Sequence, residues 1–413
     1  MITTVTILDA CTKQKTEIAA SAGSDVPRTS AKDIPNALPQ FARIITGIRR
    51  CGKSTLVQQD ILTKSPDSFY LNFDEPALSE FTRKDFAVLD EAINKYKLEH
   101  KKCNRLYFDE IQVVDGWEVY VNAKLKEGSL VTVTGSNASM LSQELGTRLT
   151  GRHLDYELFP FDFLEFCAFE KLKQTTASFE QYLNKGGFPE FLLYKREDIL
   201  LRLFDDVLLR DVVVRHGIKD VRSLRVLAVY LISNVANLVA GARLSAQLGI
   251  KTTATILDYL SFLEQSYLFS FIPKFDYSLK VQSVNPKKVY CVDTGLVNTV
   301  TRSQAKDKGR VFENAVFMKL RRTTKNIWYY SEPTFECDFL YGKSPVPTNA
   351  VQACYELTNE NREREVKGIV ETCKKFPEIK PLIVTLKQTD TISYDGMMIH
   401  VVPAVEFFGD ELF

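Results

Sequence analysis

The sequence lacks the features of a secreted or membrane-spanning protein. Its N-terminus has no basic stretch followed by an apolar core, so no signal peptide is expected. It also contains no run of about 18 uninterrupted apolar residues, the length that a membrane helix needs. The closest candidate, residues 226–240, is interrupted by Ser233, Asn234 and Asn237 and is predicted to be a buried helix. These absences predict a cytoplasmic protein without a membrane partner.

Paired cysteines and an excess of one charge are missing too. The eight cysteines are scattered with no C-x-x-C pair, which favours reduced thiols in a cytosolic protein. The net charge of +1 neither demands nor excludes nucleic acid as a partner. The remaining composition is that of an ordinary globular protein, with 45% hydrophobic and 25% charged residues. A chain of 413 residues is long enough for two or three domains.

Residues 47–54 read G-x-x-x-x-G-K-S, the pattern of a phosphate-binding P-loop. The glycines let the backbone curl until its N–H groups point at an anion. Lys53 is predicted to reach the β and γ phosphates of ATP, and the Ser54 hydroxyl to bind Mg²⁺. Residues 41–46 read as a buried strand, and a helix that favours phosphate at its N-terminus is expected from Ser54 onward. The predicted nucleotide-binding residues are Gly47, Ile48, Arg49, Arg50, Cys51, Gly52, Lys53, Ser54 and Thr55.

An apolar strand that ends in two acids follows about fifty residues later. Residues 105–110 have the Walker B pattern, in which Asp109 is predicted to hold Mg²⁺ and Glu110 to polarise the attacking water. Phosphoryl transfer needs mainly positioning and charge neutralisation, so these few groups suffice for ATP hydrolysis. The alternative is a strand that ends in two solvated acids. The position after a P-loop favours the catalytic interpretation.

Two further segments are predicted to join the same sheet. Asn137 follows residues 130–135, where a side chain that senses the γ-phosphate would lie beside the Walker B strand. Asn72 ends another predicted strand and is a candidate to hydrogen-bond Glu110 and hold it idle. Turn chemistry is the alternative for Asn137, and a polar residue at the margin of a sheet is the alternative for Asn72.

A glycine-containing stretch carries two arginines, Arg148 and Arg152. Either is a candidate arginine finger that would act on the nucleotide of a neighbouring subunit in a homo-oligomer. Arg152 is preferred because a new apolar segment begins just beyond it. The alternative is that both are solvated surface arginines.

The chain divides into five predicted regions. Residues 1–40 are a lead-in with turns and a short strand at 4–8, and residues 41–165 alternate strand and helix as a parallel α/β core. Residues 166–221 form a helical lid, and residues 222–285 have the helix, helix, hairpin order of a winged helix. Residues 286–413 form a second α/β domain.

The predicted winged helix is a weak candidate for reading DNA. The helix at residues 252–263 has only Lys251 near its N-terminus, whereas a DNA-reading helix usually carries several basic or amide side chains. A module that packs against protein explains the pattern equally well.

The last region has the element order of a restriction-endonuclease-like core, with carboxylates at Glu313, Glu336 and Asp338. Such a core continues with (Glu/Gln)-x-Lys, but residues 352–354 read Gln-Ala-Cys. A cysteine supplies no ammonium, so nuclease activity is doubtful, although the Gln352 carbonyl remains a possible metal ligand. The alternative is that these acids cap or solvate the domain.

Several of these motifs together resemble the prokaryotic AAA-type P-loop ATPases that carry a DUF4143 C-terminal region. The matching segments are residues 46–55, 108–112, 134–138, 149–152, 159–161, 186–190, 288–296 and 312–316. The resemblance implies an ASCE-class (AAA-like) parallel sheet followed by a helical lid, a winged helix and a nuclease-like terminal domain. Cys354 departs from the family's lysine and weakens the nuclease inference further.

Three functions remain open from the sequence. The first is a Mg²⁺-dependent AAA-type ATPase that couples its nucleotide state to a protein or DNA partner. The second is a nucleotide-gated interaction protein with little intrinsic hydrolysis. The third is an ATP-regulated DNA nuclease, for which the only added support is a basic cluster: Lys306, Lys308, Arg310, Lys319, Arg321, Arg322 and Lys325. A solvated helix face is the alternative for that cluster.

Overall fold

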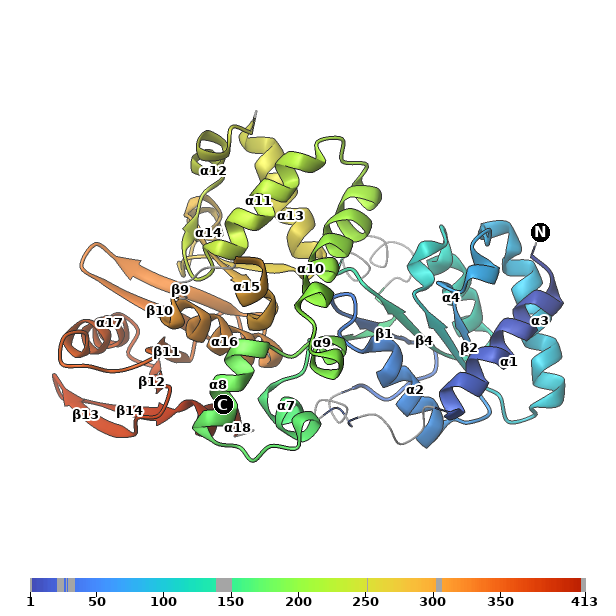
Figure 1. Ribbon diagram of the computed structural model, residues 1–413, viewed down its shortest axis with the longest axis horizontal. Coiled ribbons are helices and arrows are strands. Elements are labelled where there is room, and N and C mark those ends of the chain that lie inside the picture. Colours follow the sequence, from blue (N-terminus) through green and yellow to red (C-terminus); the bar gives the residue numbers. More distant parts are fainter. Residues whose placement is uncertain are drawn as a thin grey trace. The chain divides into compact units, whose positions relative to one another are not determined.

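The computed structural model describes residues 2–20, 26, 28, 34–138, 151–250, 252–301 and 307–409. The chain forms two compact units, Met1–Leu158 and Phe159–Phe413, and many of their elements are labelled in Figure 1. Among the described helices, none is both long enough and apolar enough to cross a membrane.

The N-terminal unit is built on a five-stranded sheet in which every pair of neighbours is parallel. The strand order is β2-β3-β4-β1-β5, which confirms the predicted parallel α/β sheet. Its strands are β1 (Ala42–Thr46), β2 (Phe69–Asn72), β3 (Arg105–Asp109), β4 (Leu130–Gly135) and β5 (His153–Glu157). The carboxyl ends of β1, β3 and β4 therefore meet at one edge of the sheet, where parallel α/β folds place their ligands.

Helices cover both faces of this sheet: α2 (Lys53–Lys64), α3 (Phe86–Glu99) and α4 (Trp117–Lys126). On β1, Ala42 and Ile44 join an apolar core with side chains of α3 and α4. Arg43 points the other way and forms a buried ion pair with Asp60 of α2. All five residues of β1 are buried, as expected for a central parallel strand.

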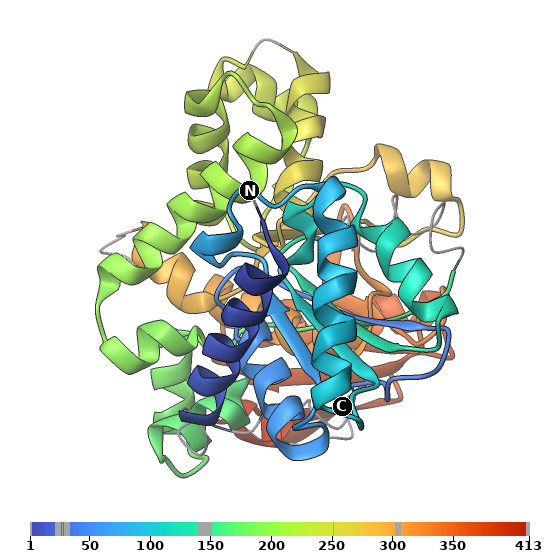
Figure 2. The same ribbon diagram turned by 90° about the vertical axis from the view of Figure 1, so that its right-hand side faces the viewer.

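The N-terminal residues form a helix, α1 (Thr4–Ala20), so the predicted strand at residues 4–8 is wrong. Ile7, Cys11 and Ile18 recur at helical spacing and are buried, and α1 contacts α3 and β2 (Figure 2). The side-chain amide of Gln14 bonds both backbone groups of Asn72 at the edge of β2, accepting from its N–H at 2.9 Å and donating to its carbonyl at 3.3 Å. The helix thus covers one edge of the sheet.

The C-terminal unit begins with helices. These are α7 (Phe163–Glu170), α8 (Thr176–Lys185), α9 (Pro189–Tyr194), α10 (Glu197–Asp206) and a π-helical segment (Val207–Val214). The predicted break at residues 186–189 lies between α8 and α9, where Gly186 has φ +70°. Asp293 fixes this break, because its carboxylate accepts the Gly187 N–H at 2.6 Å and the Leu296 N–H at 2.9 Å.

Three helices and a small antiparallel sheet follow. The helices are α11 (Val221–Ser233), α12 (Gly241–Leu248) and α13 (Thr253–Gln265), and the strands are β6 (Leu238–Val239), β7 (Phe269–Ile272) and β8 (Lys287–Cys291), in the order β6-β8-β7. Thr252 caps α13 by accepting the Thr255 N–H. The partner of β7 is β8, which follows the short helix α14 (Leu279–Val284) and lies within the sequence range assigned above to the terminal domain.

The rest of the unit is a six-stranded mixed sheet in the order β13-β14-β12-β11-β10-β9. Its elements are α15 (Thr294–Thr301), α16 (Lys308–Thr323), β9 (Ile327–Glu332), β10 (Phe335–Tyr341), β11 (Asn349–Ala353), α17 (Arg362–Lys375), β12 (Lys380–Thr385), β13 (Asp390–Tyr394), β14 (Met397–Pro403) and α18 (Ala404–Gly409). The edge strand β13 had no predicted counterpart. Helix α17 packs closely on β10 at Gly368, where an added Cβ would lie 2.1 Å from the carbonyl oxygen of Glu336.

Candidate nucleotide site

The loop between β1 and α2 has the backbone that a phosphate cradle needs. Gly47 and Gly52 have φ angles of +152° and +101°, which disfavour any other residue. A Cβ at Gly47 would lie 2.0 Å from the carbonyl oxygen of Leu158, so this position also has no space for a side chain. Helix α2 begins at Lys53, and its first N–H groups lie where an anion is stabilised by hydrogen bonds and by the helix dipole.

Lys53 lies across this loop with its side chain 3% exposed. Its ammonium donates to the carbonyl oxygens of Gly47 at 3.1 Å and Ile48 at 3.2 Å. A longer ion pair of 3.5 Å joins it to Glu110 at the end of β3. The lysine is therefore held between the loop backbone and the predicted catalytic carboxylate.

Asp109 is fully buried at the carboxyl end of β3. Its carboxylate accepts hydrogen bonds from the hydroxyls of Tyr70, at 2.8 Å, and Thr134, and it is also bonded to Ser54. Burial raises the pKa of Asp109, as does the charge of Glu110, whereas the three hydroxyls lower it. The two predicted metal ligands, from α2 and β3, thus lie side by side.

This pair of oxygen ligands fits Mg²⁺, which is usually bound by one or two carboxylates together with phosphates and water. No group of three or more His, Cys, Asp or Glu side chains able to hold a metal occurs among the described residues. A site of this kind therefore suits a metal that arrives with a nucleotide rather than one held in a protein cage.

Glu110 has an unusual backbone, with φ +53° in the left-handed region. For a residue other than glycine such a conformation costs about 1–3 kcal/mol and persists only where the surrounding structure holds it. Its N–H donates to Thr134 Oγ1 at 3.0 Å, the same hydroxyl that donates to Asp109. Thr134 of β4 therefore fixes both Walker B acids, a role that the sequence did not reveal because it depends on which strand lies next to β3.

The residue that holds the Glu110 side chain is Gln112, whose amide donates to its carboxylate. The prediction that Asn72 does so is wrong, because the Asn72 side-chain oxygen accepts the N–H of Asp74 at 2.8 Å, as in a turn. Gln112 lies in the turn directly after the Walker B strand, so its spacing of two residues from Glu110 was a readable signal.

The predicted sensor and finger residues lie in different places. Asn137 is fully buried just beyond the carboxyl end of β4, beside β3. Arg152 is exposed and lies at the opposite edge of the sheet, where its carbonyl accepts the N–H of Ala42 at the start of β1. The P-loop follows the other end of β1, which has five residues. A strand of five residues separates Arg152 from the P-loop of its own chain by roughly 13 Å. Arg148 lies outside the described residues.

Two residues beside the loop complete its surroundings. Cys51 is buried, its thiol donates to the Leu158 carbonyl at 3.4 Å, and burial raises its pKa. Arg28 is 6% exposed and donates to the Cys51 carbonyl at 3.0 Å. Arg28 lies in the predicted lead-in and had no signal in a single sequence. Arg49 is half-buried, Arg50 is exposed, and Thr55 is half-buried on α2.

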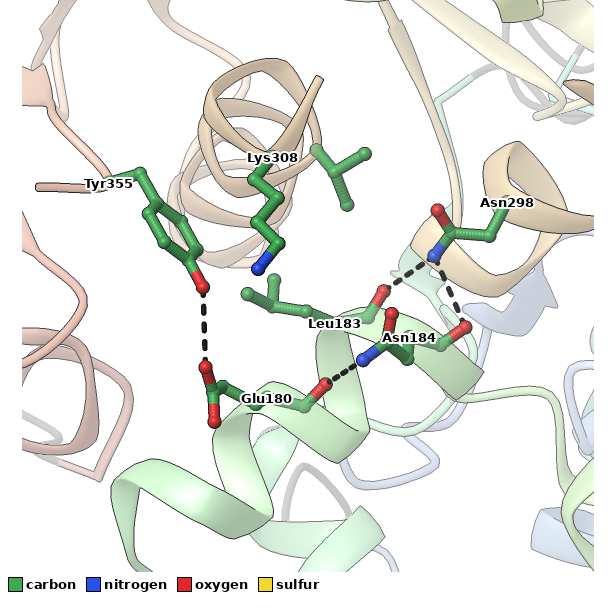
Figure 3. A pocket seen from close by; sticks show the side chains of 7 residues that line it. Glu180, Leu183, Asn184, Asn298, Lys308 and Tyr355 are labelled. Atoms are coloured by element: carbon green, nitrogen blue, oxygen red, sulfur yellow. Dashed lines mark hydrogen bonds between the residues drawn. The ribbon is translucent and has the colours of Figure 1, made fainter. Parts of the chain in front are cut away.

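The C-terminal unit has a small cavity between α8, α15 and α16 (Figure 3). Its volume is about 210 Å³, and its lining residues are Glu180, Leu183, Asn184, Asn298, Lys308, Val311 and Tyr355. The Tyr355 hydroxyl donates to Glu180 at 3.3 Å, and the Asn298 amide donates to the carbonyls of Leu183 and Asn184. Ligand sites usually measure about 300–1,000 Å³, so this cavity is too small for a nucleotide.

Comparison with known proteins gives the family. The model for AAA domains matches residues 40–167, and that for a domain of unknown function, DUF8612, matches residues 176–307. The uncharacterized protein MJ1544 of Methanocaldococcus jannaschii is 32% identical over 399 residues, covering 89% of this chain and 88% of the relative. The chain belongs to the same AAA-type family. The matching second model is DUF8612 rather than the DUF4143 region suggested by the motifs.

A second relative and two solved structures also match this AAA-type chain. An uncharacterized protein of Haemophilus influenzae is 29% identical over 388 residues, covering 88% of this chain and 93% of the relative. Among solved structures, the Hsp104–ADP complex of S. cerevisiae matches with a TM-score of 0.35 and 15% identity over 61% of this chain and 41% of that one. PCH-2 of C. elegans matches with a TM-score of 0.23 and 13% identity over 62% of this chain and 66% of that one.

Proposed function

We propose that this protein is a Mg²⁺-dependent ATPase of the AAA type, which couples its nucleotide state to a partner. The observation that carries the proposal is the convergence of Lys53, Ser54, Asp109 and Glu110 at one edge of the parallel sheet. The match of an AAA-domain family to residues 40–167 supports the nucleotide as ligand. The chemistry assigned to each residue is our inference from its place in this site.

The residues of this site would take part in successive steps of ATP binding and hydrolysis. ATP phosphates would accept hydrogen bonds from the loop and from the first turn of α2. Lys53 would exchange its carbonyl partners and the 3.5 Å ion pair with Glu110 for phosphate oxygens. Ser54 and Asp109 would hold Mg²⁺, which supplies charge neutralisation on the phosphates. Glu110, released from Lys53, would orient the attacking water, and Asn137 would contact the γ-phosphate.

Coupling to a second subunit follows from the position of Arg152. Because this arginine lies at the edge of the sheet opposite to its own P-loop, it would act as a finger only on the nucleotide of a neighbouring copy. The proposal therefore includes a homo-oligomer as the active form, in which hydrolysis increases with protein concentration.

Steady-state ATP turnover with Mg²⁺ tests the proposal. Wild-type protein, Lys53→Ala and Arg152→Ala would be compared over a range of protein concentrations, and Arg83→Ala would serve as the control at an exposed arginine outside the P-loop. We expect turnover to disappear in Lys53→Ala, to lose its concentration dependence in Arg152→Ala, and to persist in Arg83→Ala. Turnover that is unchanged by Lys53→Ala would reject the site.

A nucleotide-gated interaction protein is the second candidate. The observation that favours it is the engagement of Glu110 by both Lys53 and Gln112, which keeps the carboxylate away from a water. Such a protein would bind ATP tightly and hydrolyse it slowly until a partner changed these contacts. Calorimetry that finds ATP binding without turnover at any protein concentration would favour this candidate over the oligomeric ATPase.

The partner is better described as a protein than as DNA. The helix order and the β6-β8-β7 sheet support a winged-helix-like module, but α13 carries no lysine or arginine, and its exposed face includes Asp258 and Leu257. In the basic cluster, Arg322 donates to the Pro160 carbonyl and Lys319 to the Phe408 carbonyl, so part of its charge serves internal contacts. Failure of duplex and single-stranded DNA to change turnover or to bind would support this choice.

A further inference from the structure

A buried lysine lies at the centre of the acidic residues of the C-terminal unit. Lys288 of β8 is only 3% exposed and forms ion pairs with Glu313 of α16 at 3.1 Å, and with Glu336 and Asp338 of β10 at 2.6 Å and 3.0 Å. Its ammonium donates hydrogen bonds to Glu313 and Asp338, while its contact with Glu336 is an ion pair. In the chain, Lys288 precedes the residues of the nuclease-like pattern, which run from Glu313 to Cys354.

The remaining hydrogen-bonding capacity of this cluster is also used. The Tyr290 hydroxyl donates to Glu313 at 2.7 Å, and the N–H of Ala353 donates to the second oxygen of Asp338 at 3.0 Å. The Gln352 carbonyl accepts the Asp338 N–H at 3.2 Å, and its amide donates to Glu365 at 2.7 Å. Gln352 therefore fixes the ends of β10 and β11 and is not directed at a metal.

These residues do not fit the divalent cation of a nuclease-like centre. Such an ion needs several oxygens at about 2.0–2.6 Å, whereas here the ammonium is surrounded by oxygens at 2.6–3.1 Å. The Cys354 thiol donates to the Glu356 carbonyl at 3.2 Å, and burial raises its pKa to about 12, so it is no thiolate ligand. Among the described residues, these acids included, no group of three or more His, Cys, Asp or Glu side chains is arranged to hold a metal.

We propose that Lys288 is a built-in counter-ion that occupies the carboxylate site of the C-terminal unit in place of a metal. The ammonium joins β8 of the small sheet to α16 and β10, and it removes the nuclease function from the site. The C-terminal unit then has no metal requirement of its own.

The acidic neighbours of Lys288 favour the charged form of its side chain. Burial lowers the pKa of Lys288, but the surrounding carboxylates outweigh this effect and hold it well above the ordinary value. The acidic side chains around the Lys288 nitrogen therefore favour its ammonium form, and this ammonium fills the space between them.

Mn²⁺ binding to the full-length, nucleotide-free chain tests the proposal, measured by electron paramagnetic resonance and by the thermal unfolding midpoint. We expect no Mn²⁺ that depends on Asp338 in the wild type. Lys288→Met keeps the length of the side chain and removes its charge, so this variant should unfold at lower temperature without metal. It should then gain one Mn²⁺ and a higher midpoint, and both gains should disappear in Lys288→Met/Asp338→Asn. Lys287→Met, at the exposed neighbour on the same strand, is the matched control.

Three results would overturn the proposal. The first is wild-type Mn²⁺ binding, or Mn²⁺-dependent cleavage of plasmid DNA, that is lost in Asp338→Asn. The second is a folded Lys288→Met chain that binds no Mn²⁺, and the third is a Lys288→Met chain as stable as the wild type without metal. The wild-type measurement requires no variant, so the proposal stays testable even where Lys288→Met does not fold.

Discussion

The two units contain the same ingredients, a buried lysine beside carboxylates, but combine them differently. Lys53 and Lys288 are each 3% exposed. Lys53 has two backbone carbonyls and one carboxylate at 3.5 Å, whereas Lys288 has three acidic side chains within 3.1 Å. Lys53 can exchange its weak partners for phosphate. Lys288 cannot leave without removing the cation beside the buried Asp338, the half-buried Glu313 and the exposed Glu336. The number and the charge of a lysine's partners thus separate a ligand-binding group from a structural one.

The largest expected effects come from replacing each of the two lysines in turn, which tests whether their roles differ. Lys53→Ala should abolish ATP binding, since it removes the cation that faces the phosphates, and should leave the urea unfolding of the C-terminal unit unchanged. Lys288→Met should lower the free energy of unfolding of that unit by about 3–5 kcal/mol, because buried acids lose their counter-ion. Calorimetry with ATP and urea unfolding, applied to both variants, would reveal the crossed pattern, and equal effects of both changes on both measurements would contradict it.

The next effect separates binding from chemistry within the N-terminal unit. Glu110→Gln keeps the shape of the side chain but removes its charge, so we expect ATP to bind while turnover falls by about 10²–10³-fold. Parallel measurements of ATP affinity and of phosphate release check this expectation. Turnover at the wild-type rate in this variant would remove Glu110 from the mechanism.

A pH-dependent effect is expected in the C-terminal unit. Burial and the nearby charge of Asp338 raise the pKa of Glu313 from its ordinary value of 4.5 to about 8. The stability contributed by the protonated form is complete below about pH 4.5 and is lost as the pH rises through 8. The free energy of unfolding should therefore fall between about pH 5 and 8, and Glu313→Gln should flatten this part of the curve. A slope that persists in the variant would assign it to other groups.

The smallest effect concerns the restraint on Glu110. Gln112→Ala removes a hydrogen bond to a charged side chain, so we expect basal ATP turnover to rise about fivefold, equivalent to about 1 kcal/mol. Asn72→Ala is the comparison variant, because the Asn72 side chain bonds its own turn and Tyr70 but not Glu110. A rise in the comparison variant alone would restore Asn72 as the restraining residue.

The sequence revealed those parts of the site that depend on local backbone. The P-loop and the strand that ends in Asp109 and Glu110 were predictable because phosphate and Mg²⁺ binding require particular residues within short segments. Thr134 and Lys288 were not, since their roles depend on which strands and helices become neighbours. Arg28 acts through a contact with Cys51 that is 23 positions away in the chain, and no pattern marks it.

Secondary structure was predicted with similar limits. The alternation of strands and helices after residue 41 indicated the parallel sheet, because buried strands and amphipathic helices differ in period. Helix α1 was missed because threonines and lysines dilute its apolar stripe, although Ile7, Cys11 and Ile18 have helical spacing. The partner of β7 was missed because α14 separates it from β8 in the chain.

The pairing of Gln14 with Asn72 gives α1 a protective role. Strand β2 is at the end of the sheet, and an open strand edge readily pairs with another chain. Gln14 presents one N–H donor and one carbonyl acceptor to this edge, as a peptide group of an added strand would. A chain shortened to begin after residue 20 would therefore keep its P-loop but lose this cover, and would be prone to aggregate through β2.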